Sequence, residues 1–150
     1  MHPHVTVRVF SFAVWTVCQD YTYDELLRHG VQIPTLNDFK NIILMTETSE
    51  EMPTPELVFR IFRALGERGI LARVKGLIVG RPQSWGFDRQ NSVREKSEYR
   101  RKQREITLQV FRAYNQTAPI IQNMDFGHAN PQVPMPYGKN VRIHTVNNMC

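Results

Sequence analysis

Short apolar runs alternate with amphipathic segments along the chain, and this pattern predicts strands separated by helices. Residues 41–46 are too few for a helix and are bounded by polar positions, which is typical of a buried strand. Residues 74–79 and 120–124 have the same character. Strict alternation of apolar and polar residues at 5–9 and 141–144 predicts two further short strands.

Two segments have helical character. Thr54 can cap free N–H groups, Pro55 fits the first helical position, and Glu56 complements the positive end of the helix dipole. Apolar residues then follow at positions 57, 58, 61, 62 and 65, which forms one stripe, and Gly69 is a natural stop. Residues 94–113 are helical by propensity.

Strand-like and helix-like segments in alternation predict a layered α/β domain. The stretch 127–138 is rich in proline and glycine, so we expect it to be a loop. At 150 residues the chain has the length of one ordinary domain.

The formal charge of +5 is modestly basic and gives only weak support to an anionic partner such as nucleic acid. Six basic residues crowd the segment 94–105, with Glu95, Glu98 and Glu105 interspersed to pair with them. We therefore expect a solvated charged face there, and nucleic acid is an unlikely partner. Binding that weakens steeply with added salt would favour the nucleic-acid alternative.

Neither the cysteines nor the apolar stretches indicate export. Cys18 and Cys150 have no zinc-site spacing and do not suggest a disulfide framework. The apolar stretch 5–17 is well short of the roughly 20 residues that cross a bilayer. We expect a cytoplasmic protein without membrane contact.

Three carboxylates, Glu47, Glu50 and Glu51, follow the strand at 41–46 directly. Ligand and catalytic groups in α/β sheets favour such strand ends. Clustered carboxylates also repel each other unless a cation or a histidine lies against them. Taken alone, the cluster is more typical of a solvated acidic turn that leads into the following helix.

His128 follows the strand at 120–124, in a loop too rich in proline to be helical. Histidine is the side chain best suited to moving protons near neutral pH, although a histidine bonded to loop backbone would look the same. Residues 125–127 spell Asp-Phe-Gly, but no phosphate loop accompanies them, so a kinase is excluded. A metal site built from Glu47, Asp125, His128 and His144 has no supporting spacing.

Three separated motifs resemble the LD-carboxypeptidase family, in particular its branch related to microcin C immunity peptidases. Residues 43–51 (Ile-Leu-Met-Thr-Glu-Thr-Ser-Glu-Glu) resemble the family's strand and turn, and residues 76–82 (Gly-Leu-Ile-Val-Gly-Arg-Pro) resemble its next strand. Pro119 through Gly138 resemble its closing signature, with Asp-Phe-Gly-His at 125–128 and prolines at 131, 134 and 136.

This resemblance implies the family's C-terminal domain, a small mixed-sheet domain of the swivelling β/β/α type with flanking helices. It also implies a serine-type carboxypeptidase that hydrolyses cell-wall peptides or peptide–nucleotide antibiotics through a Ser–Glu–His triad. The triad glutamate would be Glu47 and the triad histidine His128, with no cofactor and no metal. The peptide substrate would resemble a murein tetrapeptide or a peptide–nucleotide.

The sequence departs from the family in its N-terminal part. Residues 1–25 have no match, and the domain resembling the family covers 26–150. No serine carries the flanking glycines of a nucleophile elbow, so we expect the nucleophile domain to be absent and the chain alone to be inactive. The chain would be a truncated gene product, a frameshifted remnant or an isolated domain. The alternative is a non-catalytic binding or scaffold domain that self-associates through a former interface.

Overall fold

The computed structural model describes residues 7–11, 28, 30, 35–86, 88, 90–128, 130–136 and 138–143. Its elements follow in the order β1 (Val7–Ser11), β2 (Ile42–Thr46), α3 (Pro55–Glu67), β3 (Gly76–Gly80), α4 (Val93–Tyr114), β4 (Ile120–Met124) and β5 (Asn140–Val141). Strands and helices alternate through the middle of the chain, so the predicted α/β class is confirmed.

The strands form one mixed sheet in the order β4-β3-β2-β1-β5. The pairs β1–β2, β2–β3 and β3–β4 are parallel, and β5 pairs antiparallel with β1. Every residue of β2 and β3 is buried, as expected for central strands of a parallel sheet. The parallel strands therefore end at one common edge, where Thr46, Gly80 and Met124 are the last residues of β2, β3 and β4.

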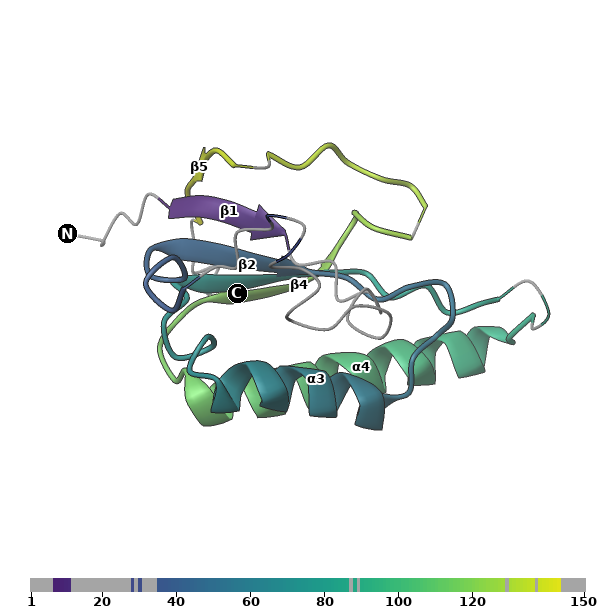
Figure 1. Cartoon of the computed structure of the whole chain (residues 1–150). Helices are drawn as coiled ribbons and strands as arrows, with labels where there is room; N and C mark the ends of the chain where they lie inside the picture. Colours follow the sequence, from purple (N-terminus) through teal and green to yellow (C-terminus); the bar gives the residue numbers. More distant parts are fainter. Residues whose placement is uncertain are drawn as a thin grey trace, which may run out of the picture.

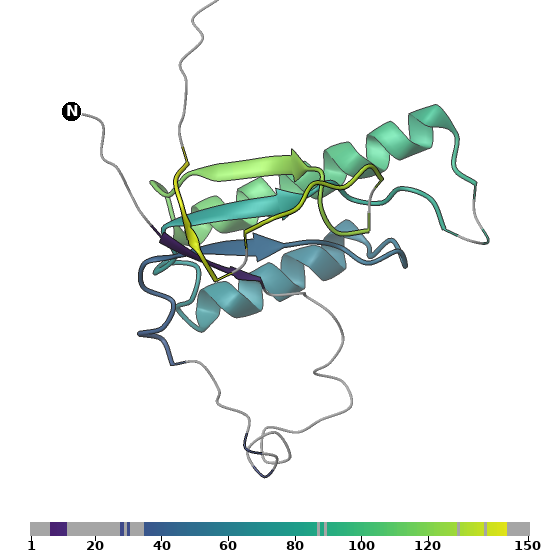
Figure 2. The same ribbon diagram turned by 90° about the horizontal axis from the view of Figure 1, so that it is seen from above.

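Both described helices cover the same face of the sheet (Figure 1). The predicted cap of α3 is confirmed, since the Thr54 hydroxyl accepts a hydrogen bond from the Leu57 N–H at 3.2 Å. The α4 helix begins with a capping box in which Ser92 and Glu95 bond each other's backbone N–H groups. Figure 2 shows α3 and α4 running alongside each other beneath the strands.

Apolar side chains from the helices and the two central strands form the core. The α3 stripe contributes Val58, Phe62 and Leu65, and the C-terminal half of α4 contributes Val110 and Phe111. The helices approach closely where Gly66 meets the Tyr114 ring, because an added Cβ would lie 2.3 Å from that ring.

Buried Asn115 fixes the turn that follows α4. Its side-chain amide donates to the carbonyls of Leu71 (2.9 Å) and Val74 (3.0 Å), while its oxygen accepts from the Ala118 N–H at 3.0 Å. These bonds join the chain before β3 to the chain before β4.

The predicted strands at 41–46, 74–79 and 120–124 are confirmed, with the second beginning two residues later. The strand predicted at 5–9 is observed at Val7–Ser11, and the one predicted at 141–144 is observed at Asn140–Val141, while His144 lies outside the described residues. Helices are found at both predicted places. In the part of the chain that the structure describes, no helix is long and apolar enough to cross a membrane.

Candidate active site

Three loops leave the sheet at the edge where β2, β3 and β4 end. They begin with Glu47, Arg81 and Asp125, each of which directly follows the last residue of its strand. The carboxyl edge of a parallel sheet is where α/β proteins place ligand-binding and catalytic groups.

Glu47 and His128, 81 residues apart in sequence, meet at this edge. The His128 Nδ1 atom lies 3.2 Å from the Glu47 Oε2 atom. The side chains are 27% exposed for Glu47 and 37% for His128, so the pair is partly shielded and still open to solvent. The two residues that the sequence singled out from separate motifs are thus brought together.

Glu50 approaches the other side of the same imidazole ring. Its Oε2 atom lies 2.9 Å from His128 Nε2, so the ring stands between two carboxylates. An imidazolium can donate from both nitrogens, whereas a neutral imidazole can donate to only one of these partners. We call Glu47, Glu50 and His128 the histidine corner. The sequence placed Glu50 in the acidic cluster but gave no sign of its contact with His128.

Two glycines make room for the Glu47 side chain. A Cβ added to Gly127 would lie 1.6 Å from Glu47 Oε2, and the φ of Gly127 is +86°, where side chains are strained. A Cβ added to Gly80 would lie 2.9 Å from the Phe126 carbonyl oxygen and 3.3 Å from the Glu47 Cβ. Neither position tolerates a side chain without moving the carboxylate or the histidine loop.

Arg81 stabilises the loop that carries His128 through hydrogen bonds. Its Nε atom donates to Asp125 Oδ1 at 2.8 Å, and a terminal nitrogen donates to the Asn130 carbonyl at 2.9 Å. The Arg81 N–H also bonds the Met124 carbonyl at 2.7 Å. The loop is closed on itself by the Gln132 side chain, which donates to the Gly127 carbonyl. The arginine of the Gly-Arg-Pro motif, to which the sequence assigned no role, positions the histidine loop.

Side chains of α4 form hydrogen bonds with the segment between Glu50 and α3. Both the Tyr99 hydroxyl and the Gln103 amide donate to the Pro53 carbonyl, at 3.1 and 2.6 Å. Burial raises the pKa of Tyr99 to about 12, so this hydroxyl stays protonated and remains a donor well above neutral pH.

The remaining candidates do not join the corner. Glu51 is exposed, and Asp125 faces Arg81 rather than His128. His144, considered for a metal site, lies outside the described residues. Within the described ranges, no three His, Cys, Asp or Glu side chains are arranged to hold a metal ion.

A sequence profile of the LD-carboxypeptidase C-terminal domain matches residues 24–143. No curated protein sequence matches the chain significantly.

Solved structures share the fold. An MccF-like protein from Streptococcus pneumoniae, solved in complex with AMP, superposes with a TM-score of 0.68 at 23% identity, over 93% of this chain and 38% of its own. The wild-type microcin C7 self-immunity protein MccF gives a TM-score of 0.59 at 19% identity, over 95% of this chain and 39% of its own. The same protein in complex with aspartyl sulfamoyl adenosine gives the same values. The chain thus spans about two-fifths of the length of these proteins.

Proposed function

We propose a function from one premise: this chain belongs to the LD-carboxypeptidase C-terminal domain family. In that function the chain supplies the glutamate and the histidine of a serine-peptidase active site. In this proposal the serine nucleophile comes from outside these 150 residues, on the domain that the larger relatives possess. The observation that carries the proposal is the 3.2 Å contact between Glu47 and His128 at the carboxyl edge of the sheet.

Each residue of the pair has a distinct task. Glu47 accepts a hydrogen bond from the Nδ1–H group of His128, which fixes the ring tautomer and stabilises the imidazolium that forms during the reaction. His128 Nε2 then takes the proton of the attacking serine hydroxyl and later passes it to the leaving amine. Backbone N–H groups beside the serine would hold the oxyanion.

Glu50 occupies the place that the serine hydroxyl needs. It lies 2.9 Å from His128 Nε2, the nitrogen that must face the nucleophile. The proposal therefore requires Glu50 to leave Nε2 when a serine arrives. Its side chain is 39% exposed and lies in a turn rather than a strand.

The substrate class follows from the family and from the ligands of the structural relatives. MccF has been solved with aspartyl sulfamoyl adenosine, in which an amino acid is joined to a nucleoside. We propose that the completed enzyme hydrolyses an amide bond of this kind or of a cell-wall peptide, with the acyl carbon attacked by serine.

A chimeric enzyme tests the proposal. Residues 24–143 of this chain would replace the corresponding part of MccF, and release of aspartate from aspartyl sulfamoyl adenosine would be measured. We expect hydrolysis by the chimera and none by the 150-residue chain alone. His128→Gln in the chimera should lower kcat by at least roughly 10³-fold, because the general base is lost.

Glu51→Gln is the matched control, since Glu51 is exposed and does not contact the histidine corner. It should change kcat by less than about twofold. A chimera that binds aspartyl sulfamoyl adenosine without hydrolysing it would contradict the proposal and favour a binding or scaffold domain.

A further inference from the structure

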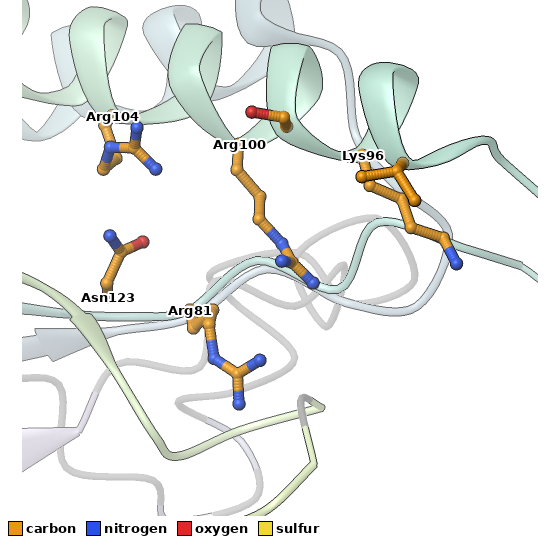
Figure 3. A pocket seen from close by; sticks show the side chains of 7 residues that line it. Arg81, Lys96, Arg100, Arg104 and Asn123 are labelled. Carbon is orange, nitrogen blue, oxygen red and sulfur yellow. The ribbon is translucent and has the colours of Figure 1, made fainter.

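A pocket of about 360 Å³ lies between the N-terminal half of α4 and the ends of β3 and β4. Four cations line it: Arg81, Lys96, Arg100 and Arg104. The last three recur every four residues along α4 and therefore share one face of the helix. Figure 3 shows Arg100 reaching from α4 toward Arg81, with Arg104 above Asn123. We call this site the basic pocket.

The positive charge of the basic pocket is largely unneutralised. No carboxylate is found among the described residues that line the pocket, and of its four cations only Arg81 has an acidic partner there, Asp125. Arg100 donates one hydrogen bond to the Pro82 carbonyl at 3.3 Å, and Lys96 lies 5.6 Å from the centre of the Trp85 ring. Among the described residues, Lys96, Arg100 and Arg104 form no salt bridge.

Carboxylates of α4 lie on another face of the helix. Glu98 and Glu105 both pair with Arg101 at 2.7 Å, and Glu98 also lies 3.6 Å from Lys102. The expectation that acidic residues neutralise this helix therefore holds for Arg101 and Lys102, while Lys96, Arg100 and Arg104 have no such partner in the described part of the chain.

The pKa values of the adjacent residues Arg100 and Arg101 shift in opposite directions. Burial lowers the pKa of Arg100, and the nearby charges of Arg81 and Arg104 lower it further. The hydrogen bonds that Arg101 donates to Glu98 and then to Glu105 raise the pKa of Arg101. Cations held close together without counter-charges favour an anion that can contact several of them at once.

We propose that the basic pocket binds a compact polyphosphate anion, such as the diphosphate group of a small phosphorylated ligand. The three unpaired cations match the charge of a diphosphate, and arginine guanidinium groups bind phosphate oxygens with paired hydrogen bonds. The Ser97 hydroxyl and the Asn123 amide add neutral donors at the pocket wall. Asn123 has a φ of +66°, an unusual conformation that recurs at ligand sites.

A small ligand fits these observations better than a nucleic-acid strand. Proteins that bind single strands stack bases on aromatic rings, and none of the described residues that line the basic pocket is aromatic. The Trp85 ring already lies under Lys96.

Titration calorimetry with inorganic pyrophosphate, on the full 150-residue chain in metal-free buffer at about 50 mM salt, tests the proposal. We expect one saturable site with a Kd on the order of 100 µM or tighter. Arg100→Gln should raise Kd at least about 10-fold. Arg101→Gln is the matched control, because it removes the same charge from the next residue on the salt-bridged face, and it should raise Kd less than about twofold.

Three results would overturn the proposal. One is the absence of saturable binding up to about 5 mM pyrophosphate by the wild-type chain. Another is an equal loss for Arg100→Gln and Arg101→Gln, which would indicate attraction by net charge alone. An oligothymidylate that binds more tightly than pyrophosphate, with a steep salt dependence, would likewise replace the small ligand by nucleic acid. None of these measurements depends on hydrolysis, so the result stands apart from the proposed peptidase function.

Discussion

His128 lies between two carboxylates, whereas Arg100, at the same edge of the sheet, lies among other cations. The histidine corner contains a histidine and the two carboxylates beside it, and the glycines at positions 80 and 127 leave room for the Glu47 side chain. In the basic pocket, Lys96, Arg100 and Arg104 have no acidic partner among the described residues, while Arg81 pairs with Asp125. The first arrangement suits proton transfer, and the second suits the binding of an anion.

Arg81 belongs to both regions. Its guanidinium donates hydrogen bonds to Asp125 and to the Asn130 carbonyl in the histidine loop, and the residue also lines the basic pocket. The comparison can therefore be sharpened by variants that change one region and leave the other intact.

The largest effect is expected from exchanging carboxylates within the histidine corner. In the active chimera, Glu47→Gln should lower kcat by about 10³- to 10⁴-fold, because an amide does not stabilise the imidazolium or enforce the productive tautomer. Glu50→Gln should change kcat by less than about fivefold, because the serine displaces Glu50 from Nε2. Steady-state kinetics of both variants checks this, and the reverse ranking would assign the triad role to Glu50.

Next in size is the effect of a methyl group at position 127. Gly127→Ala should lower the free energy of unfolding by about 2–4 kcal/mol, because the positive φ is strained and the Cβ collides with Glu47. Urea denaturation of the full chain measures the loss. Gly86→Ala is the control, since nothing lies within 4 Å of its added Cβ. Equal stability of the two variants would show that Glu47 is not confined by the loop.

An intermediate effect is expected where the two regions join. Arg81→Gln should destabilise the chain by about 1 kcal/mol, because its partner Asp125 is 43% exposed and solvent screens the pair. A double-mutant cycle with Asp125→Asn isolates the contribution of the contact. A coupling energy near zero would mean that Arg81 serves the basic pocket alone.

The smallest effect is expected on the salt-bridged face of α4. The pKa of Glu98 lies below its ordinary value of 4.5, mainly because Arg101 donates hydrogen bonds to the carboxylate. Glu98 therefore stabilises the fold above pH 4.5, and this contribution is lost as the pH falls through the lower folded-state pKa. Urea midpoints of wild type and Glu98→Gln should differ slightly at pH 6 and converge in acid. A constant difference at all pH values would contradict this linkage.

Local patterns were sufficient to predict most of the fold. The apolar runs 41–46 and 120–124 became β2 and β4, and Thr54 capped α3 as its hydroxyl and the following proline indicated. The family motifs also pointed to Glu47 and His128. These features depend on neighbouring residues, on hydrophobic periodicity and on the ends of strands, all of which can be recognised in the sequence.

Contacts between distant loops were decided by the tertiary structure alone. Glu50 reaches His128, Arg81 reaches Asp125 and Asn130, and Gly127 stands against Glu47 only because parallel pairing aligns the ends of β2, β3 and β4. On α4, helical spacing alone pairs Arg101 with Glu98 and Glu105 and leaves Arg100 without a carboxylate one turn away. Only the packing of the helix on the sheet brings Arg81 beside Arg100 and so forms the basic pocket. Sequence spacing fixes which residues share a helix face, but the partners of that face come from parts of the chain that folding brings beside it.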